Sequence, residues 1–299
     1  MPERSVGVLR RAGLGDVLLG TAAAWRYAAA TGRTLRLDWR HSRYASAPTN
    51  LFSEVFQPMS HWRGVPVWLP PPTEPLEPYP PLTAADERRS GLEACELVQS
   101  GRDVVDPHVV LRGCVAPAHP PLDVIAPLLR ELSLQPRLAA AVASTRQEVM
   151  GDGPSIGVHL RHGNGGDIMG HAAFWSDGLA VQRVVHAVRH ARSVLGGDTP
   201  VFLATDSAEV RDAVCALLPG VRTIDKRFRA PGAGELHRWG EAPSTLDAAV
   251  VEMWLLSYST VLVRMPPLSY FSAPGAFMKA PAPASLLQRV PPAMEPAVW

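Results

Sequence analysis

The stretch SVGVLRRAGLGDVLLGTAAAWRYAAATGRTLRLDW, residues 5–39, decides the fold class. Its apolar start leads into a glycine-rich turn (AGLGD) and then an Ala/Leu-rich segment over 17–31 that favours a helix, which Gly32 ends. Residues 34–39 then alternate between polar and apolar side chains, as a strand does. Strand, glycine-rich turn, helix and strand in this order predict a parallel α/β sheet.

A second α/β pattern follows Gly151-Asp152-Gly153-Pro154, the best candidate for a linker. Its predicted strands and helices lie at 156–160, 179–195, 200–205, 208–218, 221–224, 244–257 and 260–264. The sequence therefore predicts an N-terminal domain over 1–150, with a proline-rich surface excursion at 66–82, and a C-terminal domain over 151–299 whose last residues wrap back over the surface. Two Rossmann-like domains would face a cleft, with ligands at the carboxyl ends of the strands.

The composition excludes several classes of protein. The chain has 299 residues and a net charge of +1, which gives no electrostatic case for nucleic acid or an anionic membrane surface. Its three cysteines are scattered, so they fit neither a disulfide framework nor a zinc ribbon and favour a cytoplasmic setting. No apolar run reaches the roughly 18 residues that a membrane span requires. Nearly all basic residues are arginine, and the only lysines are Lys226 and Lys279.

The most specific segment is IGVHLRHGNGGD, residues 156–167, in which an apolar strand leads directly into polar side chains and glycines. Arg161, with the backbone N–H groups after it, can hold a diphosphate and neutralise charge on a departing phosphate. His159 and His162 point to opposite faces of a strand and make a poor shared ligand set, so no metal site is predicted. The alternative is an ordinary loop whose histidines bond to backbone.

Two further strand ends carry polar side chains. In ATDS, residues 204–207, Asp206 can accept the N–H groups of a guanine or bind a ribose hydroxyl; alternatively it caps the next helix together with Ser207. Ser269 and Ser272 follow the last predicted strand, where hydroxyls and free N–H groups at a helix start form an anion site. Ordinary capping is the alternative there as well.

The N-terminal glycine turn has GxG rather than GxGxxG spacing, which is weak evidence for a nucleotide site. The turn, its acid and the polar end of the next strand instead predict an acceptor-side loop that binds sugar hydroxyls or takes a proton. The residues concerned are Gly13, Gly15, Asp16, Asp38, Trp39 and Arg40. A helix cap with a buried polar partner is the alternative.

Four segments, in chain order, carry a family resemblance: GLGDVLLGTAAAWRYAAATGRTLRLDWR (13–40), HLRHGN (159–164), ATDS (204–207) and VEMWLLSYSTVLVRMPPLSYFS (251–272). Together they resemble the bacterial nodulation protein Z-type fucosyltransferases, which stand with the alpha-1,6-fucosyltransferases in a superfamily that includes protein O-fucosyltransferases. The pair HxRHGN and ATDS is the more specific part, and the N-terminal segment is supportive. Residues 60–150 carry little resemblance.

The resemblance implies a GT-B-like fold and an inverting transfer of L-fucose from GDP-fucose without a required metal or other cofactor. It implies that Arg161 holds the β-phosphate and is the key catalytic residue. The donor-binding residues taken from it are His159, His162, Gly163, Asn164, Asp206, Ser207, Ser269, Phe271 and Ser272. The family often has an acid where this chain has Gly166, so Asp167, Asp16 and Asp38 all stay open as the general base.

These observations predict a cytoplasmic enzyme that transfers L-fucose from GDP-fucose to a hydroxyl of a sugar or small glycoside, without a nucleic-acid partner or a membrane span. The short chain and its proline-rich middle favour a small acceptor, such as a metabolite or an antibiotic scaffold. Two alternatives stay open. One is a transferase that uses another GDP-hexose or another nucleotide sugar on a natural-product scaffold. The other is a non-catalytic protein that binds sugar or nucleotide.

Overall fold

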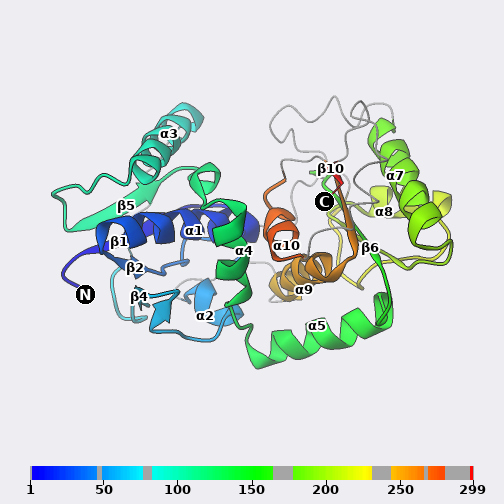
Figure 1. Cartoon of the computed structure of the whole chain (residues 1–299), viewed down its shortest axis with the longest axis horizontal. Helices are drawn as coiled ribbons and strands as arrows, with labels where there is room; N and C mark the ends of the chain where they lie inside the picture. The colour runs from blue at the N-terminus through cyan, green and yellow to red at the C-terminus, as the bar shows by residue number, and fades with distance from the viewer. Residues whose placement is uncertain are drawn as a thin grey trace. The chain divides into compact units, whose positions relative to one another are not determined.

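The computed structural model describes residues 2–45, 49–76, 83–163, 178–230, 244–265, 269–279 and 297–298. They divide into two compact units, the first ending at Pro136 and the second starting at Arg137. Each unit contains a five-stranded, mainly parallel sheet with helices packed on it (Figure 1). The predicted α/β class with two Rossmann-like units is confirmed. The sequence analysis draws its boundary at 150/151, and the roles it gives the two domains stay predictions.

The first unit is built around β1 (Ser5–Leu9), which lies between β2 (Thr34–Arg36) and β5 (His108–Arg112) and runs parallel to both. The strand order is β3-β4-β2-β1-β5, in which β4 (Val65–Trp68) is parallel to β2 and β3 (His61–Trp62) is antiparallel to β4. The helical elements are α1 (Leu14–Thr31), α2 (Leu51–Val55), α3 (Ala84–Ser100), the 3-10 turn η1 (Ala116–Ala118) and α4 (Leu122–Arg130).

Helix α1 explains why the opening stretch decides the fold. Most of its residues are small or apolar and buried, and it contacts β1, β2, β4 and α3. Gly32 ends the helix with φ +66°, a left-handed conformation that glycine adopts without a Cβ clash. The predicted strand–turn–helix–strand unit is thus confirmed, although β2 ends at Arg36 rather than at residue 39.

Two parts of the first unit differ from the sequence-based expectation. Strand β4 lies partly inside the expected proline-rich excursion: Val67 and Trp68 pair with Leu35 and Arg36 of β2, so the surface-loop prediction is wrong for residues 66–68. Residues 77–82 lie outside the described part of the chain.

Helix α3 was not predicted at all, although the sequence carries a start signal for it. The Thr83 hydroxyl accepts the Asp86 N–H, and the Asp86 carboxylate accepts in return from the Thr83 N–H, which together make a capping box.

The second unit has the strand order β10-β9-β6-β7-β8. Strands β6 (Ile156–Leu160), β7 (Val201–Thr205), β8 (Val221–Arg222) and β9 (Val261–Met265) are parallel, and β10 (Ala297–Val298) is antiparallel to β9. The helices are α5 (Pro136–Val149), α7 (Leu179–Leu195), α8 (Ala208–Leu217), α9 (Ser244–Tyr258) and α10 (Ala273–Met278).

The two faces of this second sheet differ in chemistry. Alternate residues of β6, β7 and β9, such as Val158, Leu203 and Val263, form one apolar core with buried residues of α7 and α8. The intervening residues point to the opposite face, because successive side chains of a strand alternate. There β6 and β7 contact α9, and His159 and Arg264 are register partners on neighbouring strands. The sequence thus places two polar side chains on one buried face.

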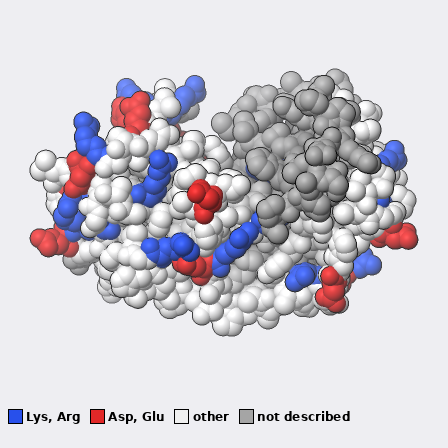
Figure 2. Space-filling model, in the orientation of Figure 1, with Lys and Arg blue, Asp and Glu red and all other residues white. Residues whose placement is uncertain are grey.

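The surface carries both signs of charge. On the face that Figure 2 shows, basic and acidic side chains are intermixed, in line with the net charge of +1. Within the described ranges, no helix has the length and apolar character needed to cross a membrane.

Candidate functional site

The carboxyl end of the second sheet gathers several of the predicted site residues, and Asp206 lies at its centre. Asp206 directly follows β7, and its Oδ1 and Oδ2 accept the backbone N–H groups of His162 (2.7 Å) and Gly163 (2.9 Å). These two N–H groups converge because Gly163 has φ +78°, a conformation that disfavours any side chain. Asp206 therefore fixes the backbone of His162 and Gly163, directly after β6 and Arg161. Contact with a guanine or a ribose stays a prediction.

Arg161 leaves β6 beside this carboxylate. Its Nε lies 3.3 Å from Asp206 Oδ2, and its backbone N–H donates to the Met265 carbonyl at 2.8 Å, where β9 ends. The side chain is 18% exposed, so its charge is oriented by the protein and still reachable from solvent. A guanidinium held in this way can meet a phosphate without first reorganising.

His159 is buried on the same face of the sheet as Arg264. Burial lowers its pKa well below the usual range, and the positive charges of Arg161, Arg264 and Lys226 lower the pKa further, so the imidazole is neutral at pH 7. Its ring packs against Phe271 with centroids 5.1 Å apart, and its Nδ1 is buried with no hydrogen-bond partner in the described part of the chain. A buried polar atom left unsatisfied is uncommon in a folded protein and marks this face as a candidate ligand site.

The serines predicted for the donor site are engaged by the protein itself. Ser207 caps α8, with its Oγ accepting the Val210 N–H, so the capping alternative holds for this residue. Ser272 is fully buried, and its Oγ accepts from Arg264 Nε at 2.9 Å, while the Ser269 carbonyl accepts from Arg264 Nη2 at 2.8 Å. The geometry gives no support to a direct phosphate contact from the Ser207 or Ser272 hydroxyl.

Three charged residues of this edge were not predicted. Lys226 donates to Glu252 Oε1 at 2.5 Å, with both side chains under 10% exposed, and Arg264 is buried beside His159. Burial raises the pKa of Glu252, and the repulsion from Asp206 adds to this, while Lys226 opposes it. Glu252 and Arg264 each stand alone in an apolar run (VVEMWLL and VLVRM), which was the available signal.

In the first unit, Asp38 is enclosed by its own neighbours. Its carboxylate accepts from Arg36 Nη2 (2.8 Å) and from Arg40 Nε (2.8 Å) and Nη2 (2.7 Å). Burial alone would raise the pKa of Asp38, but the hydrogen bonds and charges of Arg40 and Arg36 outweigh burial and hold it below its usual range. A carboxylate bound in this way is a poor proton acceptor at neutral pH, which disfavours Asp38 as the general base.

Three other acceptor-side candidates, Gly13, Gly15 and Asp16, lie at the start of α1. Asp16 lies in the first turn of α1, 15% exposed, and pairs with Arg10 at 3.3 Å. Gly13 precedes α1 in an ordinary extended conformation (φ −68°, ψ 165°), and Gly15 is buried in the helix's first turn. These three residues do follow a strand, as predicted, and what they bind stays a prediction.

Trp39 is part of the core. It is 2% exposed, its Nε1 donates to Thr21 Oγ1 at 2.9 Å, and its ring meets Phe52 and Phe56 edge to face. This packing disfavours a contact between the Trp39 side chain and an acceptor, because its polar atom is satisfied and its ring is covered, and the acceptor-side role of Trp39 stays a prediction. Arg40, also buried, is committed to Asp38 and to the Glu74 carbonyl.

Two predicted residues, Asn164 and Asp167, lie outside the described residues. Within the described ranges, no group of three or more His, Cys, Asp or Glu side chains is arranged to hold a metal ion. That observation leaves the predicted metal independence untested.

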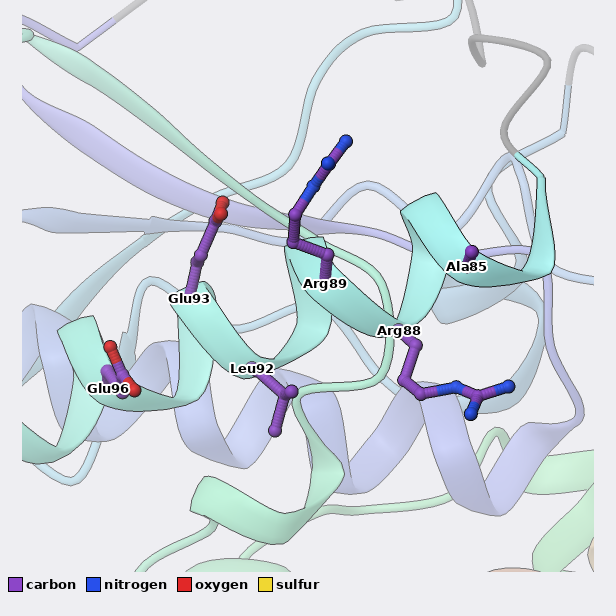
Figure 3. Close-up of a pocket in the computed structure, with 6 residues that line it drawn as sticks. All are labelled: Ala85, Arg88, Arg89, Leu92, Glu93 and Glu96. Atoms are coloured by element: carbon purple, nitrogen blue, oxygen red, sulfur yellow. The ribbon is translucent and has the colours of Figure 1, made fainter.

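A surface hollow of about 360 Å³ lies elsewhere, on helix α3 (Figure 3). Its lining residues all belong to this one helix: Ala85, Arg88, Arg89, Leu92, Glu93 and Glu96. None of the predicted site residues is among them, and side chains from a single helix do not converge on a ligand as a site requires.

The chain is similar to known proteins along nearly its whole length. The family model described as nodulation protein Z (NodZ) matches residues 2–76 and 84–280. Nodulation protein Z of Bradyrhizobium diazoefficiens is 36% identical over 292 residues, covering 90% of this chain and 78% of the relative. Nodulation protein Z of Sinorhizobium fredii is 37% identical over 297 residues, covering 91% and 90%.

Solved structures give the same picture. The crystal structure of the fucosyltransferase NodZ from Bradyrhizobium is similar with a TM-score of 0.72 and 29% identity, over 93% of each chain. A NodZ alpha-1,6-fucosyltransferase soaked with GDP-fucose gives a TM-score of 0.70 and 29% identity, again over 93% of each chain. The apo form of POFUT1 shares the fold, with a TM-score of 0.53 and 14% identity over 95% of this chain and 97% of the other. The predicted GT-B-like architecture is thereby confirmed.

Proposed function

The chain belongs to the nodulation protein Z family, and from this premise we propose that it is an alpha-1,6-fucosyltransferase that takes L-fucose from GDP-fucose. One observation carries the proposal: the chain is similar over 93% of its length to a NodZ alpha-1,6-fucosyltransferase whose crystals were soaked with GDP-fucose. The cationic carboxyl edge of the second sheet supports it, because a parallel sheet binds nucleotides at that edge.

In the proposed reaction the acceptor oxygen forms a bond to C1 of fucose while the bond from C1 to the β-phosphate oxygen breaks. GDP leaves with the electron pair, and the acceptor proton passes to a base. Arg161 neutralises the charge that develops on the departing phosphate, a contribution of about 10²–10³-fold for one well-placed donor. Asp206 orients Arg161 and the loop N–H groups beside it. Inversion at C1 and independence from metal belong to the proposal.

The general base of this proposal is Asp16 or Asp167. Asp38 is set aside because two arginines hold its carboxylate and its pKa is lowered. Asp16 keeps partial exposure beside Arg10, and one positioned proton transfer is worth about 10²–10⁴-fold.

We propose a carbohydrate or a glycosylated small molecule as acceptor, since the transfer needs a hydroxyl nucleophile. A cytoplasmic location belongs to the same proposal. It is supported by the three cysteines, Cys95, Cys114 and Cys215, all of which are free thiols, as is usual in a reducing compartment.

A thermal-shift panel with GDP, UDP, dTDP and CDP, each with and without magnesium, tests the donor. A ligand at about 100 times its Kd stabilises the protein by roughly 2.7 kcal/mol, or several degrees. The expected result is a shift with GDP that magnesium does not change. A shift with UDP or dTDP alone would contradict the fucosyltransferase, and no shift at all would favour a non-nucleotide binding protein.

Product formation is then measured with GDP-fucose and two acceptor classes, chito-oligosaccharides and small glycosides. Transfer to either supports the enzyme, and the better acceptor defines its class. GDP binding without transfer to any acceptor, or hydrolysis of the donor alone, would contradict the proposed transfer.

A further inference from the structure

Among the described residues at the carboxyl edge of the second sheet, Arg161 pairs with Asp206, and Lys226 pairs with Glu252. Arg264 has no carboxylate partner among the described residues, because its side chain donates to two neutral oxygens. One positive charge of this edge is therefore unmatched within the described part of the unit.

Arg264 carries this unmatched charge in a nearly closed environment. The residue is 4% exposed, and burial lowers its pKa to about 10, so that it is still charged at neutral pH. A buried ion without a counter-ion is costly for a fold, and such ions are usually paired. The sequence tolerates that cost at a strand whose other residues are apolar.

The contacts of Arg264 orient the side chain instead of neutralising it. Nε donates to Ser272 Oγ and Nη2 to the Ser269 carbonyl, which leaves Nη1 without a hydrogen-bond partner among the described residues. These bonds fix the plane of the guanidinium, and a planar fork held in one orientation suits phosphate oxygens.

The surroundings of Arg264 belong to the candidate donor site. It is the register partner of His159, whose Nδ1 is buried and unsatisfied, and the next residue on its strand, Met265, accepts the backbone N–H of Arg161. Phe271, which packs on His159, lies between the two serines that Arg264 contacts. Helix α9 contacts β6, and α10 packs on α9 (Figure 1).

We propose that Arg264 is a second diphosphate-binding residue of the donor site, and that a phosphate of the nucleotide sugar supplies the counter-charge that the described residues do not provide. This proposal rests on the proposed function. Ser272, which the resemblance places among the donor-binding residues, acts through Arg264 by holding its guanidinium. The two arginines then differ in role: Arg161 is held by the Asp206 carboxylate, whereas the full charge of Arg264 acts on the ligand.

The test compares GDP with guanosine, which lacks the phosphates, on wild type, Arg264→Gln, Arg264→Lys and the matched control Arg189→Gln on the exposed side of α7. GDP affinity is measured by isothermal titration calorimetry and guanosine affinity by ligand-observed NMR. Arg264→Gln should weaken GDP by roughly 10–100-fold and leave guanosine within about two-fold, because the lost bond is to a charged group. Arg264→Lys, which keeps the charge but not the fork, should lie between them, and the control should match wild type.

Equal losses for GDP and guanosine in Arg264→Gln would show a merely structural role and overturn the proposal, as would an unchanged GDP affinity. Should Arg264→Gln fail to fold, Ser272→Ala replaces it. This variant keeps the charge and frees its orientation, so GDP should weaken by roughly 3–10-fold with guanosine unchanged; no change in GDP affinity would count against the proposal. A wild type that binds neither ligand contradicts the proposed function itself, which is a different outcome from any of these.

Discussion

Two buried arginines, one in each unit, differ in how far their surroundings satisfy their charge and their N–H donors. Arg33 in the first unit is fully buried, and its donors reach the carbonyls of Ser5, Val104, Asp106 and Pro107 as well as the Asp103 carboxylate. Arg264 in the second unit is almost as deeply buried, but among the described residues its side chain donates to two neutral oxygens and to no carboxylate.

The same contrast separates the two sheet edges. In the first unit Asp38 is closed off by Arg36 and Arg40, while in the second Arg264 has no carboxylate partner and His159 Nδ1 has no hydrogen-bond partner among the residues that the structure describes. A polar group that is saturated by its own fold holds the fold together. One that is buried and incomplete is kept at a cost that a ligand can offset.

The largest effect on stability is expected at Arg33. Arg33→Met removes the donors of four backbone carbonyls that otherwise sit around a fully buried side chain, so the free energy of unfolding should fall by about 3–5 kcal/mol. Urea unfolding measures this, with Arg102→Met, an exposed arginine of the same region, as control. A loss under about 1 kcal/mol would mean that the saturated contacts of Arg33 do not stabilise the first unit, which contradicts the comparison.

The comparison also shows what could be predicted from the sequence. Local patterns sufficed for β1, α1 and the Gly32 helix end, and for the polar strand ends at Arg161 and Asp206. The capping box that starts α3 was equally local and was missed.

The partners of the charged residues could not be read locally. Lys226 and Glu252 are 26 positions apart in the chain and meet only because α9 packs on β6 and β7. A single charged residue in an apolar run indicates a buried charge that needs a partner. Which residue is that partner depends on tertiary packing. Asp38 differs in that its partners, Arg36 and Arg40, are two residues away in RLDWR, but the sequence analysis did not predict that pairing.

The next largest effect is expected on catalysis, at the carboxyl edge of the second sheet. Arg161→Ala should lower kcat by about 10²–10³-fold or more, equivalent to roughly 2.7–4 kcal/mol of transition-state stabilisation, with little change in thermal stability. Asp206 keeps its two backbone bonds in this variant, so the loop stays in place. Single-turnover transfer from GDP-fucose is the measurement and Arg189→Gln the control. Near-normal turnover in Arg161→Ala would remove Arg161 from the chemistry.

The two lysines of the chain sharpen the comparison within one residue type. Lys226 is bound to buried Glu252, whereas Lys279 donates to the Thr260 carbonyl and has its pKa lowered by burial. Lys226→Met leaves a buried carboxylate unpaired and should cost about 2–3 kcal/mol, while Lys279→Met should cost about 1 kcal/mol.

The double variant Lys226→Met/Glu252→Gln distinguishes pairing from packing. It should recover at least half of the loss, because no charge is left uncompensated. Additive losses in thermal or urea unfolding would mean that the two residues do not act as a pair.

The smallest effect is expected at Asp38, and it separates a saturated carboxylate from a catalytic one. Asp38→Asn should lower the free energy of unfolding at pH 7 by about 1–2 kcal/mol, since the three charged hydrogen bonds from Arg36 and Arg40 weaken. The folded-state pKa of Asp38 is lowered, so its stabilisation is complete above the unfolded-state pKa of about 3.9 and is lost as pH falls through the folded value. Wild type should therefore lose more stability than the variant below about pH 4. The pH dependence of kcat between pH 5 and 9 should be identical in the two proteins. Loss of an ionisation from the pH profile of kcat in Asp38→Asn would identify Asp38 as the general base. The carboxyl edge of the first sheet would then take part in catalysis, as the edge of the second sheet does.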